Sequence, residues 1–359
     1  MGTRPLVVTA DLQLLDDVLR VAAVAGVEID HRVDPAAARG DWTSAPVVVI
    51  GADAAGDCAR LRFSRRPRVV LLARGCGDAT AWQHAVGIGA EHVLFLPDAE
   101  GFLGDFLADA GEPTSAGATV VAVIGGRGGA GATTLACALA VTAARREHRV
   151  VLIDGDPLGG GLDLVFGGER AEGLRWADLE GVRGRLPAES LAAELPHLSG
   201  VSVLSWGRPG GGSAEPATVA PAAMDAVLSA GRRAADLVVV DLPRCLDDTF
   251  RLVANESDVA LLVVPAEIRA AAAAARVAAA LQASSSELRL IVRGPAPAGL
   301  PPVEVAIALS LPLSHHLRPE AGLDADLERG VPPAQSTRSP LRQLCDGLIG
   351  DLLAGRPAA

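Results

Sequence analysis

A chain of 359 residues has room for about two domains, since single cores usually stop growing at about 100 to 200 residues. Half of its residues are hydrophobic, and the formal net charge of −11 argues against a broad nucleic-acid surface, because neutralising phosphates requires a concentrated basic patch. The five cysteines show no CxxC pairing, which argues against a disulfide framework and against a structural zinc site.

The apolar runs are too short for a membrane span. Residues 259–265, among the longest, fall far short of the roughly 18 residues required, and no basic-then-apolar leader stands at the N-terminus. We therefore expect a soluble, cytoplasmic protein that has no integral membrane segment and no direct contact with nucleic acid.

Residues 1–110 alternate short β-rich runs with helical patterns. Continuous apolar strands between amphipathic helices predict a parallel sheet covered on both faces. Strands are expected within 6–10, 45–53, 67–75 and 91–98, and helices within 11–26, 79–90 and 99–111. The small and polar residues 111–118, GEPTSAGA, are interpreted as a linker to a second domain, 119–359.

The second domain repeats the α/β pattern. Strands are expected within 119–126, 149–157, 200–206, 236–243, 258–265 and 288–294. Residues 207–216 are rich in glycine and predict a flexible loop, and the alanine run 266–282 predicts a packed helix of high intrinsic propensity.

The first chemical motif is GGRGGAGATT, residues 125–134, which we call the glycine loop. Gly126, Gly128 and Gly131 form G-x-G-x-x-G after a strand, and Asp154 closes the next strand, as a dinucleotide-binding fold requires.

The same glycine loop also fits a Walker A frame. In that frame the magnesium-binding hydroxyl is retained at Thr133, whereas Ala132 replaces the lysine. Every basic residue of the chain is an arginine, which suggests a GC-rich genome. Such a bias turns lysine into arginine readily, but it does not turn lysine into alanine.

Two downstream carboxylates favour the Walker A interpretation. Asp156 lies two residues past a strand end, where it can orient water or magnesium, and Asp241 closes the apolar run DLVVVDLP in the manner of a Walker B strand. A dehydrogenase has no special need for either carboxylate, and no His–Arg pair suited to hydride transfer stands out.

These motifs, together with the tail LPLSHHLRPEAGLDADLERGVPP, resemble the MinD/ParA family of deviant Walker A ATPases, especially its CpaE/TadZ-like branch and the actinobacterial septum-site-determining proteins. The resemblance covers about 120–350. It places Arg127 where the signature lysine reaches the phosphates of a dimer partner, and Ala132 where the P-loop lysine stands.

The resemblance also implies a P-loop fold, ATP and Mg²⁺. The implied cofactor-binding residues are Gly126, Gly128, Gly129, Ala130, Gly131, Ala132, Thr133 and Thr134. The implied magnesium residues are Thr133, Asp156 and Asp241, with Asp156 also positioning water.

Losing the lysine affects binding and catalysis differently. Consecutive backbone N–H groups of the loop can still form an anion nest, whereas phosphoryl transfer relies on fixed positive charge at the phosphates. Arg127, supplied in trans, can substitute as an arginine finger. We expect weak ATP binding with little or no hydrolysis.

Three alternatives remain open. They are an active ATP hydrolase that cycles on a partner, a degenerate loop that only joins strand to helix, and an NAD(P)-dependent oxidoreductase.

Two features depart from the family. Where the family has an adenine-reading asparagine after the strand 288–294, this chain has Arg293 and Gly294. The resemblance also implies that the base lies near the strand that Pro265 ends. The C-terminal helix has one apolar face but few cations, so we expect it to pack against the domain and not to bind a membrane.

The first domain resembles a response-regulator receiver, a flavodoxin-like fold. Asp53 stands at the phosphoacceptor position and Asp11 at a metal-carboxylate position, but the receiver's lysine is missing near Leu96 and no Ser or Thr closes the strand 67–75. We therefore interpret Asp53 as a strand-end or helix-cap carboxylate and the domain as a pseudo-receiver that docks a partner.

His315 and His316 of the second domain are expected on a surface loop without a metal-ligand set.

The combined prediction is a septum-site or pilus-site positioning protein. The resemblance implies a homodimer, and we expect a division or pilus/secretion partner through the first domain. Peripheral membrane association would arise only through partners, with recruitment to the septum, the pole or the inner membrane face.

Overall fold

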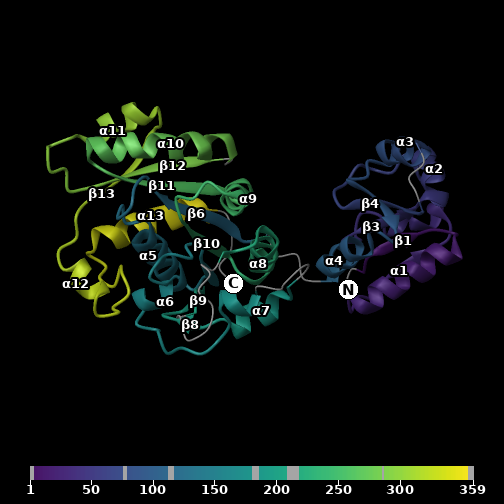
Figure 1. Ribbon diagram of the computed structural model, residues 1–359. Coiled ribbons are helices and arrows are strands. Elements are labelled where there is room, and N and C mark those ends of the chain that lie inside the picture. The colour runs from purple at the N-terminus through teal and green to yellow at the C-terminus, as the bar shows by residue number, and fades with distance from the viewer. Residues whose placement is uncertain are drawn as a thin grey trace. The chain divides into compact units, whose positions relative to one another are not determined.

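The computed structural model describes residues 4–75, 79–111, 117–179, 186–207, 218–284 and 287–354. It divides into two compact units, Met1–Ser115 and Ala116–Ala359 (Figure 1). Cys76, residues 112–116 of the expected linker, residues 208–216 of the expected glycine-rich loop, and Ser285–Ser286 lie outside the described residues.

The first unit contains a five-stranded parallel sheet in the order β2-β1-β3-β4-β5. This is the flavodoxin-like strand order, so the predicted receiver-like fold is confirmed. The strands are β1 (Leu6–Val8), β2 (Asp30–Arg32), β3 (Val48–Gly51), β4 (Val69–Arg74) and β5 (His92–Leu96). The sequence analysis missed β2, because this edge strand has half-buried polar residues and no apolar run.

Alternate residues of these strands face opposite sides of the sheet, and each side has its own apolar core. Val7 lies in the core under α1 (Leu12–Val24) and α4 (Glu100–Gly111), whereas Val8 lies in the core under α2 (Ala52–Leu61) and α3 (Ala79–Ile88). A short 3₁₀ helix, η1 (Pro35–Gly40), connects β2 to β3.

The second unit contains an eight-stranded sheet in the order β13-β12-β11-β6-β10-β7-β9-β8, with only the β8–β9 pair antiparallel. Its strands are β6 (Thr119–Gly125), β7 (Val150–Asp154), β8 (His197–Leu198), β9 (Val201–Leu204), β10 (Leu237–Leu242), β11 (Val259–Pro265), β12 (Leu288–Arg293) and β13 (Leu313–Leu317). The central strands β6, β10 and β11 are buried along their whole length, as continuous apolar runs predict.

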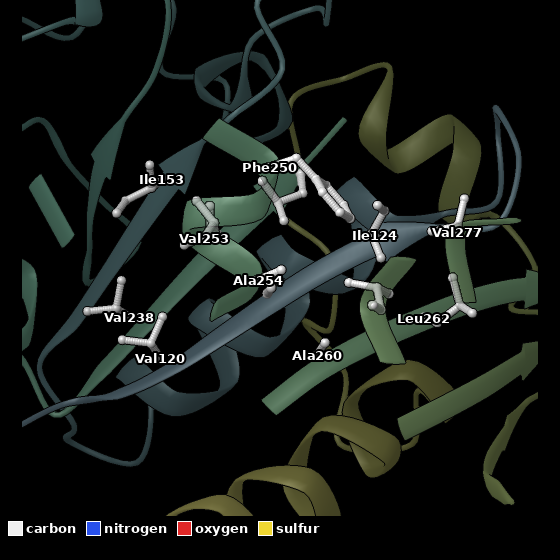
Figure 2. Close-up of a cluster of buried hydrophobic side chains, with 14 of the residues drawn as sticks. Val120, Ile124, Ile153, Val238, Phe250, Val253, Ala254, Ala260, Leu262 and Val277 are labelled. Atoms are coloured by element: carbon white, nitrogen blue, oxygen red, sulfur yellow. The ribbon is translucent and has the colours of Figure 1, made fainter. Parts of the chain in front are cut away.

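Helices cover both faces of this sheet (Figure 1). They are α5 (Ala132–Ala144), α6 (Leu162–Val165), η2 (Trp176–Leu179), α7 (Ala188–Glu194), α8 (Pro221–Ala234), α9 (Asp248–Glu256), α10 (Ile268–Ser284), α11 (Pro302–Leu309), α12 (Leu323–Leu327) and α13 (Pro340–Leu352). Figure 2 shows one core, where Phe250 and Val253 of α9 pack with Val120 and Ile124 of β6. One such core lies on each face of the sheet, and together they hold the carboxyl ends of the parallel strands in fixed positions.

The C-terminal helix α13 packs as predicted. Leu341, Leu344, Cys345, Leu348 and Ile349 are buried, and they belong to the same core as α5. No helix within the described ranges combines the length and the apolar character needed to cross a membrane.

The predicted loop around His315 and His316 is wrong. Both residues lie in β13, which pairs with β12 at the edge of the sheet. The strand is polar and irregular in register, so its sequence lacks the apolar run that marks the inner strands. His315 is half-buried, and burial lowers the pKa of its imidazole.

Candidate functional site

The glycine loop connects β6 to α5 at the carboxyl end of the sheet and borders a cavity of about 680 Å³, which we call the glycine-loop cavity. Open α/β sheets place ligand sites at this edge. The cavity is lined by Gly125, Arg127, Gly128, Gly129, Ala130, Gly131, Ala132, Thr133, Thr134, Asp156, Asp241, Leu242, Pro243, Arg244, Cys245, Arg293 and Asp324.

The backbone of the loop has the form of an anion cradle. Gly129 and Gly131 have φ of +69° and +92°, a region that side-chain-bearing residues rarely adopt. Gly131 is the N-cap of α5, and the first N–H groups of a helix have no acceptor within the helix. The helix dipole adds positive potential at the same place.

One predicted binding residue has a different role. Gly126 is buried and does not line the cavity. A Cβ there would come within 2.6 Å of the Cβ of Ala274, so this glycine allows α10 to approach the loop. The other predicted loop residues, Gly128 to Thr134, all line the cavity.

The predicted magnesium residues come together. Asp241 lines the cavity and accepts a hydrogen bond from the hydroxyl of Thr133, and Asp156 lines it from the loop after β7. Burial raises the pKa of Asp241 to about 7. Two cavity-lining carboxylates and a hydroxyl are the oxygen donors that Mg²⁺ prefers.

Asp154 stands behind this group, as the register partner of Asp241 on the neighbouring strand. Its carboxylate accepts hydrogen bonds from Asp156 N at 3.2 Å, Leu162 N at 3.0 Å and Ser205 Oγ at 2.9 Å. Burial raises its pKa to about 6. Asp154 therefore holds the loop that carries Asp156.

The dinucleotide alternative predicts that the strand ending in Asp154 lies next to the strand of the glycine loop. Here β10 is inserted between β6 and β7, hydrogen-bonded to both. The carboxylate of Asp154 is also already bound by the protein. The strand order is thus wrong for a dinucleotide fold.

Arginines surround the loop where the lysine is missing. Arg127 forms an ion pair with Glu267, with Nη2 and Oε1 2.8 Å apart, so its charge is balanced within its own chain. Arg244 and Arg293 also line the cavity. Neither Glu267 nor the approach of Arg293 to the glycine loop was predicted, because both depend on segments far apart in the sequence.

In the first unit, Asp53 lies in the first turn of α2 and both its carboxylate oxygens are hydrogen-bonded. Thr9 Oγ1 donates to Oδ1 and Ala10 N donates to Oδ2, each at 2.7 Å. Of the two expected roles, Asp53 does not have that of helix cap, because the N-cap of α2 is Gly51. The cap of α1 is instead Asp11, expected at a metal-carboxylate position, whose Oδ1 accepts from Gln13 N and Leu14 N. Asp53 therefore joins β3 to the loop after β1.

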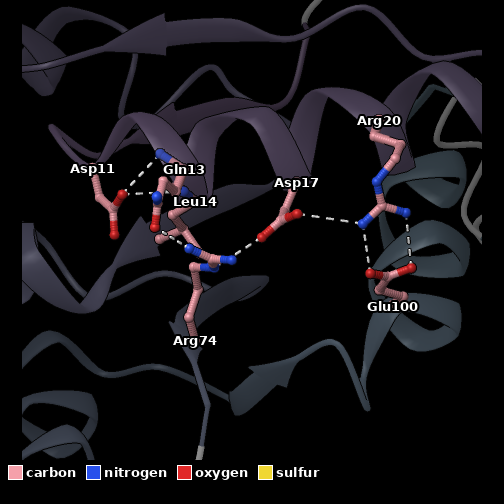
Figure 3. A network of polar contacts seen from close by, with 7 residues as sticks. All are labelled: Asp11, Gln13, Leu14, Asp17, Arg20, Arg74 and Glu100. Atoms are coloured by element: carbon pink, nitrogen blue, oxygen red, sulfur yellow. Dashed lines mark hydrogen bonds and ion pairs between the residues drawn. The ribbon is translucent and has the colours of Figure 1, made fainter.

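Arg74 ends β4, where the receiver resemblance would place a hydroxyl. Its guanidinium contacts Gln13 and lies 3.0 Å from Asp17, so it ties the strand end to α1 (Figure 3). Asp17 also pairs with Arg20, which pairs with Glu100 of α4.

Within the described ranges of both units, no three His, Cys, Asp or Glu side chains group as metal ligands.

Comparison with known proteins finds two family models that match different parts of the chain. A family model described as "Rv3660c-like, CheY-like N-terminal domain" matches residues 8–118, and one described as "Cellulose biosynthesis protein BcsQ" matches residues 118–292. The Mycobacterium tuberculosis protein Rv3660c is 44% identical over 326 residues, which span 89% of this chain and 90% of that protein.

The chain belongs to the Rv3660c-like family. The chain is also similar to the putative septum site-determining protein MinD of Nephroselmis olivacea, with 28% identity over 173 residues that span 48% of this chain and 61% of that protein.

Solved structures show the same fold in the second unit. A ParA family ATPase from Chlorobium tepidum superposes with a TM-score of 0.56 at 17% identity, across 64% of this chain and 97% of that one. The septum site-determining protein MinD of Pyrococcus horikoshii, complexed with Mg-ADP, superposes with a TM-score of 0.50 at 20% identity. The superposition covers 66% of this chain and 98% of that one. The predicted MinD/ParA fold is therefore confirmed.

Proposed function

We propose that this protein positions cell-division machinery, using a nucleotide site that binds Mg²⁺-ATP weakly and hydrolyses it little or not at all. The observation that carries the proposal is the glycine-loop cavity, which keeps the phosphate cradle, Thr133, Asp156 and Asp241 but has Ala132 at the lysine position. The relationship to a putative septum site-determining protein supports division over pilus assembly.

The residues present fit the nucleotide and its metal. Phosphate would be held by the backbone from Gly128 to Thr134, whose glycines leave open space on the cavity side at Gly129. Thr133, Asp156 and Asp241 would hold Mg²⁺, whose charge would offset the cost of keeping these carboxylates ionised. Bound Mg²⁺-ATP would supply a charged phosphate chain that bridges two copies of the chain.

The remaining roles follow from the two units. The nucleotide-bound second unit would form a homodimer, with Arg127 reaching the partner's phosphates once its bond to Glu267 opens. The first unit would not act as a phosphoacceptor, because the oxygens of Asp53 are engaged by Thr9 and Ala10 and the strand-end position holds Arg74. Its role would instead be to dock a division protein. Recruitment to the septum or the membrane would then come through that partner.

Calorimetry on the purified full chain tests the nucleotide site. ATP, ADP and NAD are titrated with and without Mg²⁺ into the wild type, Ala132→Lys and Ala132→Gln. We expect Mg²⁺-dependent ATP binding that Ala132→Lys tightens about tenfold or more, since a charged contact to phosphate is regained. Ala132→Gln controls for side-chain length. If neither the wild type nor Ala132→Lys binds any nucleotide, the loop only joins strand to helix and the proposal is wrong.

Turnover separates this proposal from an active hydrolase. Phosphate release is measured for the wild type, Ala132→Lys and Asp156→Asn. We expect little release from the wild type and more from Ala132→Lys, because the lysine stabilises charge that develops on the phosphates. Fast wild-type turnover that Asp156→Asn abolishes would favour the hydrolase alternative.

A further inference from the structure

We propose that Arg293 is the phosphate-binding cation of the glycine-loop cavity and supplies in cis the charge that Ala132 lacks. The proposal rests on the proposed nucleotide site. It also predicts the ligand class, which is a polyphosphate chain recognised with little regard to the base attached to it.

The sheet brings Arg293 to the loop. Arg293 is the last residue of β12, and it is paired in register with Pro265 of β11 and Leu317 of β13. From this strand end its side chain reaches the glycine loop, with Nη2 3.5 Å from the carbonyl oxygen of Gly129. An added Cβ on Gly131 would lie 3.1 Å from Nη1 and 3.4 Å from Cδ, so the missing side chain of Gly131 makes room for the guanidinium.

The other cavity arginines are placed differently. Arg127 is paired with Glu267 at 2.8 Å. Arg244 is exposed, and its Nη2 lies 4.0 Å from the position of an added Cβ on Gly128. Arg293 is half-buried, and no carboxylate among the described residues forms an ion pair with it. Of the three, Arg293 combines an unbalanced charge with direct contact to the loop.

The hydrogen-bonding capacity of Arg293 is also incompletely used. Its Nε is buried without a partner among the described residues, and the contact of its Nη2 with the carbonyl oxygen of Gly129 is at the long limit of a hydrogen bond. A guanidinium stays protonated throughout the physiological pH range, and its planar set of donors matches phosphate oxygens. A phosphate seated in the cradle would therefore accept hydrogen bonds from the Nη donors of Arg293, for which the long contact to Gly129 is the one hydrogen bond among the described residues.

The same chemistry limits base recognition. Arg293 stands at the strand end where the family resemblance places an adenine-reading asparagine, which this chain lacks. A guanidinium has donors and no acceptor, so it cannot accept a hydrogen bond from the adenine amino group. Because the side chain is directed to the loop at Gly129 and Gly131, the phosphate chain supplies the recognition.

The test uses inorganic tripolyphosphate, Mg²⁺-ATP and Mg²⁺-GTP as probes of the full-length protein, with calorimetry as the readout. The variants are Arg293→Ala, Arg293→Lys and the double variant Ala132→Lys/Arg293→Ala. Arg276→Ala is the matched control, since Arg276 is exposed on α10 and does not line the cavity. Thermal unfolding of each variant verifies that it is folded.

We expect Arg293→Ala to weaken tripolyphosphate and ATP equally, by about tenfold or more, while Arg276→Ala binds as the wild type does. Arg293→Lys should keep part of the affinity, and Ala132→Lys should restore binding in the Arg293→Ala background. ATP and GTP should bind the wild type within a few-fold of each other.

Three results would overturn the assignment, and they are distinguishable. Wild-type binding that Arg293→Ala leaves unchanged rejects the role of Arg293 but keeps the nucleotide site. Tighter binding to Arg293→Ala would mean that the guanidinium occupies the phosphate position and blocks it. A wild type that binds none of the three probes rejects the proposed nucleotide site and Arg293 with it.

Discussion

Arg127 of the glycine loop forms an ion pair with Glu267, with Nη2 and Oε1 2.8 Å apart. Arg127 belongs to the loop after β6, and Glu267 lies two residues past the end of β11. The sequence analysis expected Arg127 to act on the phosphates of a dimer partner. In the single chain its charge is instead held by a neighbouring strand end, so release of Arg127 would have to accompany dimer formation.

Glu267→Gln should therefore favour the nucleotide-linked dimer. Both side chains of the pair are more than a third exposed, at 38% and 35%, and such pairs contribute at most about 1 kcal/mol to stability. We expect almost unchanged thermal stability and a larger dimer fraction in Mg²⁺-ATP, measured by sedimentation velocity. Glu287→Gln, which removes an acidic partner of Arg289 on β12, is the control. An unchanged or smaller dimer fraction would show that Arg127 has no role in trans.

The carboxylates Asp241 and Asp154 make stability depend on pH. Their pKa values in the folded protein, about 7 and about 6, lie above the ordinary value because both groups are buried. Between the unfolded and folded pKa values the folded state binds more protons than the unfolded state. The free energy of unfolding should therefore fall as pH rises from about 4 to about 7.

Asp241→Asn should flatten this pH profile, because it removes the group with the larger pKa shift. At about pH 8 the variant should be more stable than the wild type by about 1 kcal/mol or more. Mg²⁺ should raise the melting temperature of the wild type more at pH 8 than at pH 5 and should have no effect on Asp241→Asn. Asp248→Asn, at an exposed site, controls for net charge. Identical pH profiles for Asp241→Asn and wild type would contradict the prediction.

Gly155 should be much more sensitive to substitution than Gly160 of the same loop after β7. Its N–H donates to the carbonyl oxygen of Asp241 at 2.8 Å, and an added Cβ would come within 2.7 Å of that oxygen. Gly155→Ala should push β7 from β10, costing about 1 to 3 kcal/mol and weakening nucleotide binding. Gly160→Ala in the same loop meets no atom within 4 Å and should be nearly neutral. Equal melting temperatures for the two variants would rule out this crowding.

Asp53 should act as a structural residue and not as a phosphoacceptor. Asp53→Asn replaces one accepting oxygen by an amide donor opposite Thr9 or Ala10, and should cost about 1 to 3 kcal/mol of stability. Thr9→Val should be destabilising too, and the two effects should be less than additive because they remove the same bond. Asp57→Asn on the exposed face of α2 is the control.

A phosphotransfer assay checks the same residue directly. The wild type and Asp53→Asn are incubated with labelled acetyl phosphate and Mg²⁺. We expect no label that depends on Asp53, since this domain has neither the receiver's lysine near Leu96 nor a Ser or Thr that closes the strand 67–75. Incorporation by the wild type that Asp53→Asn abolishes would establish a phosphoacceptor and overturn the pseudo-receiver interpretation.

The local parts of this protein could be predicted from its sequence. Continuous apolar runs such as 119–125 and 259–265 identify the inner strands, because a strand covered on both faces has no polar side to show. The spacing of glycines indicates the phosphate cradle, since Gly129 and Gly131 do adopt the left-handed backbone that such loops require. The alanine at position 132, where the Walker A pattern has a lysine, is visible in the sequence itself. Polar edge strands such as β2 and β13 carry no such pattern and were missed.

The tertiary structure decided which charges meet. The insertion of β10 between β6 and β7 places Asp241 beside Asp154 and excludes the dinucleotide strand order. The position of β12 brings Arg293 to Gly129, from 164 residues away in the chain. Pairing between distant segments depends on how whole strands and helices pack, and no local pattern of residues encodes it. For that reason the glycine loop was found in the sequence, whereas the arginine proposed to act on its ligand was found only in the fold.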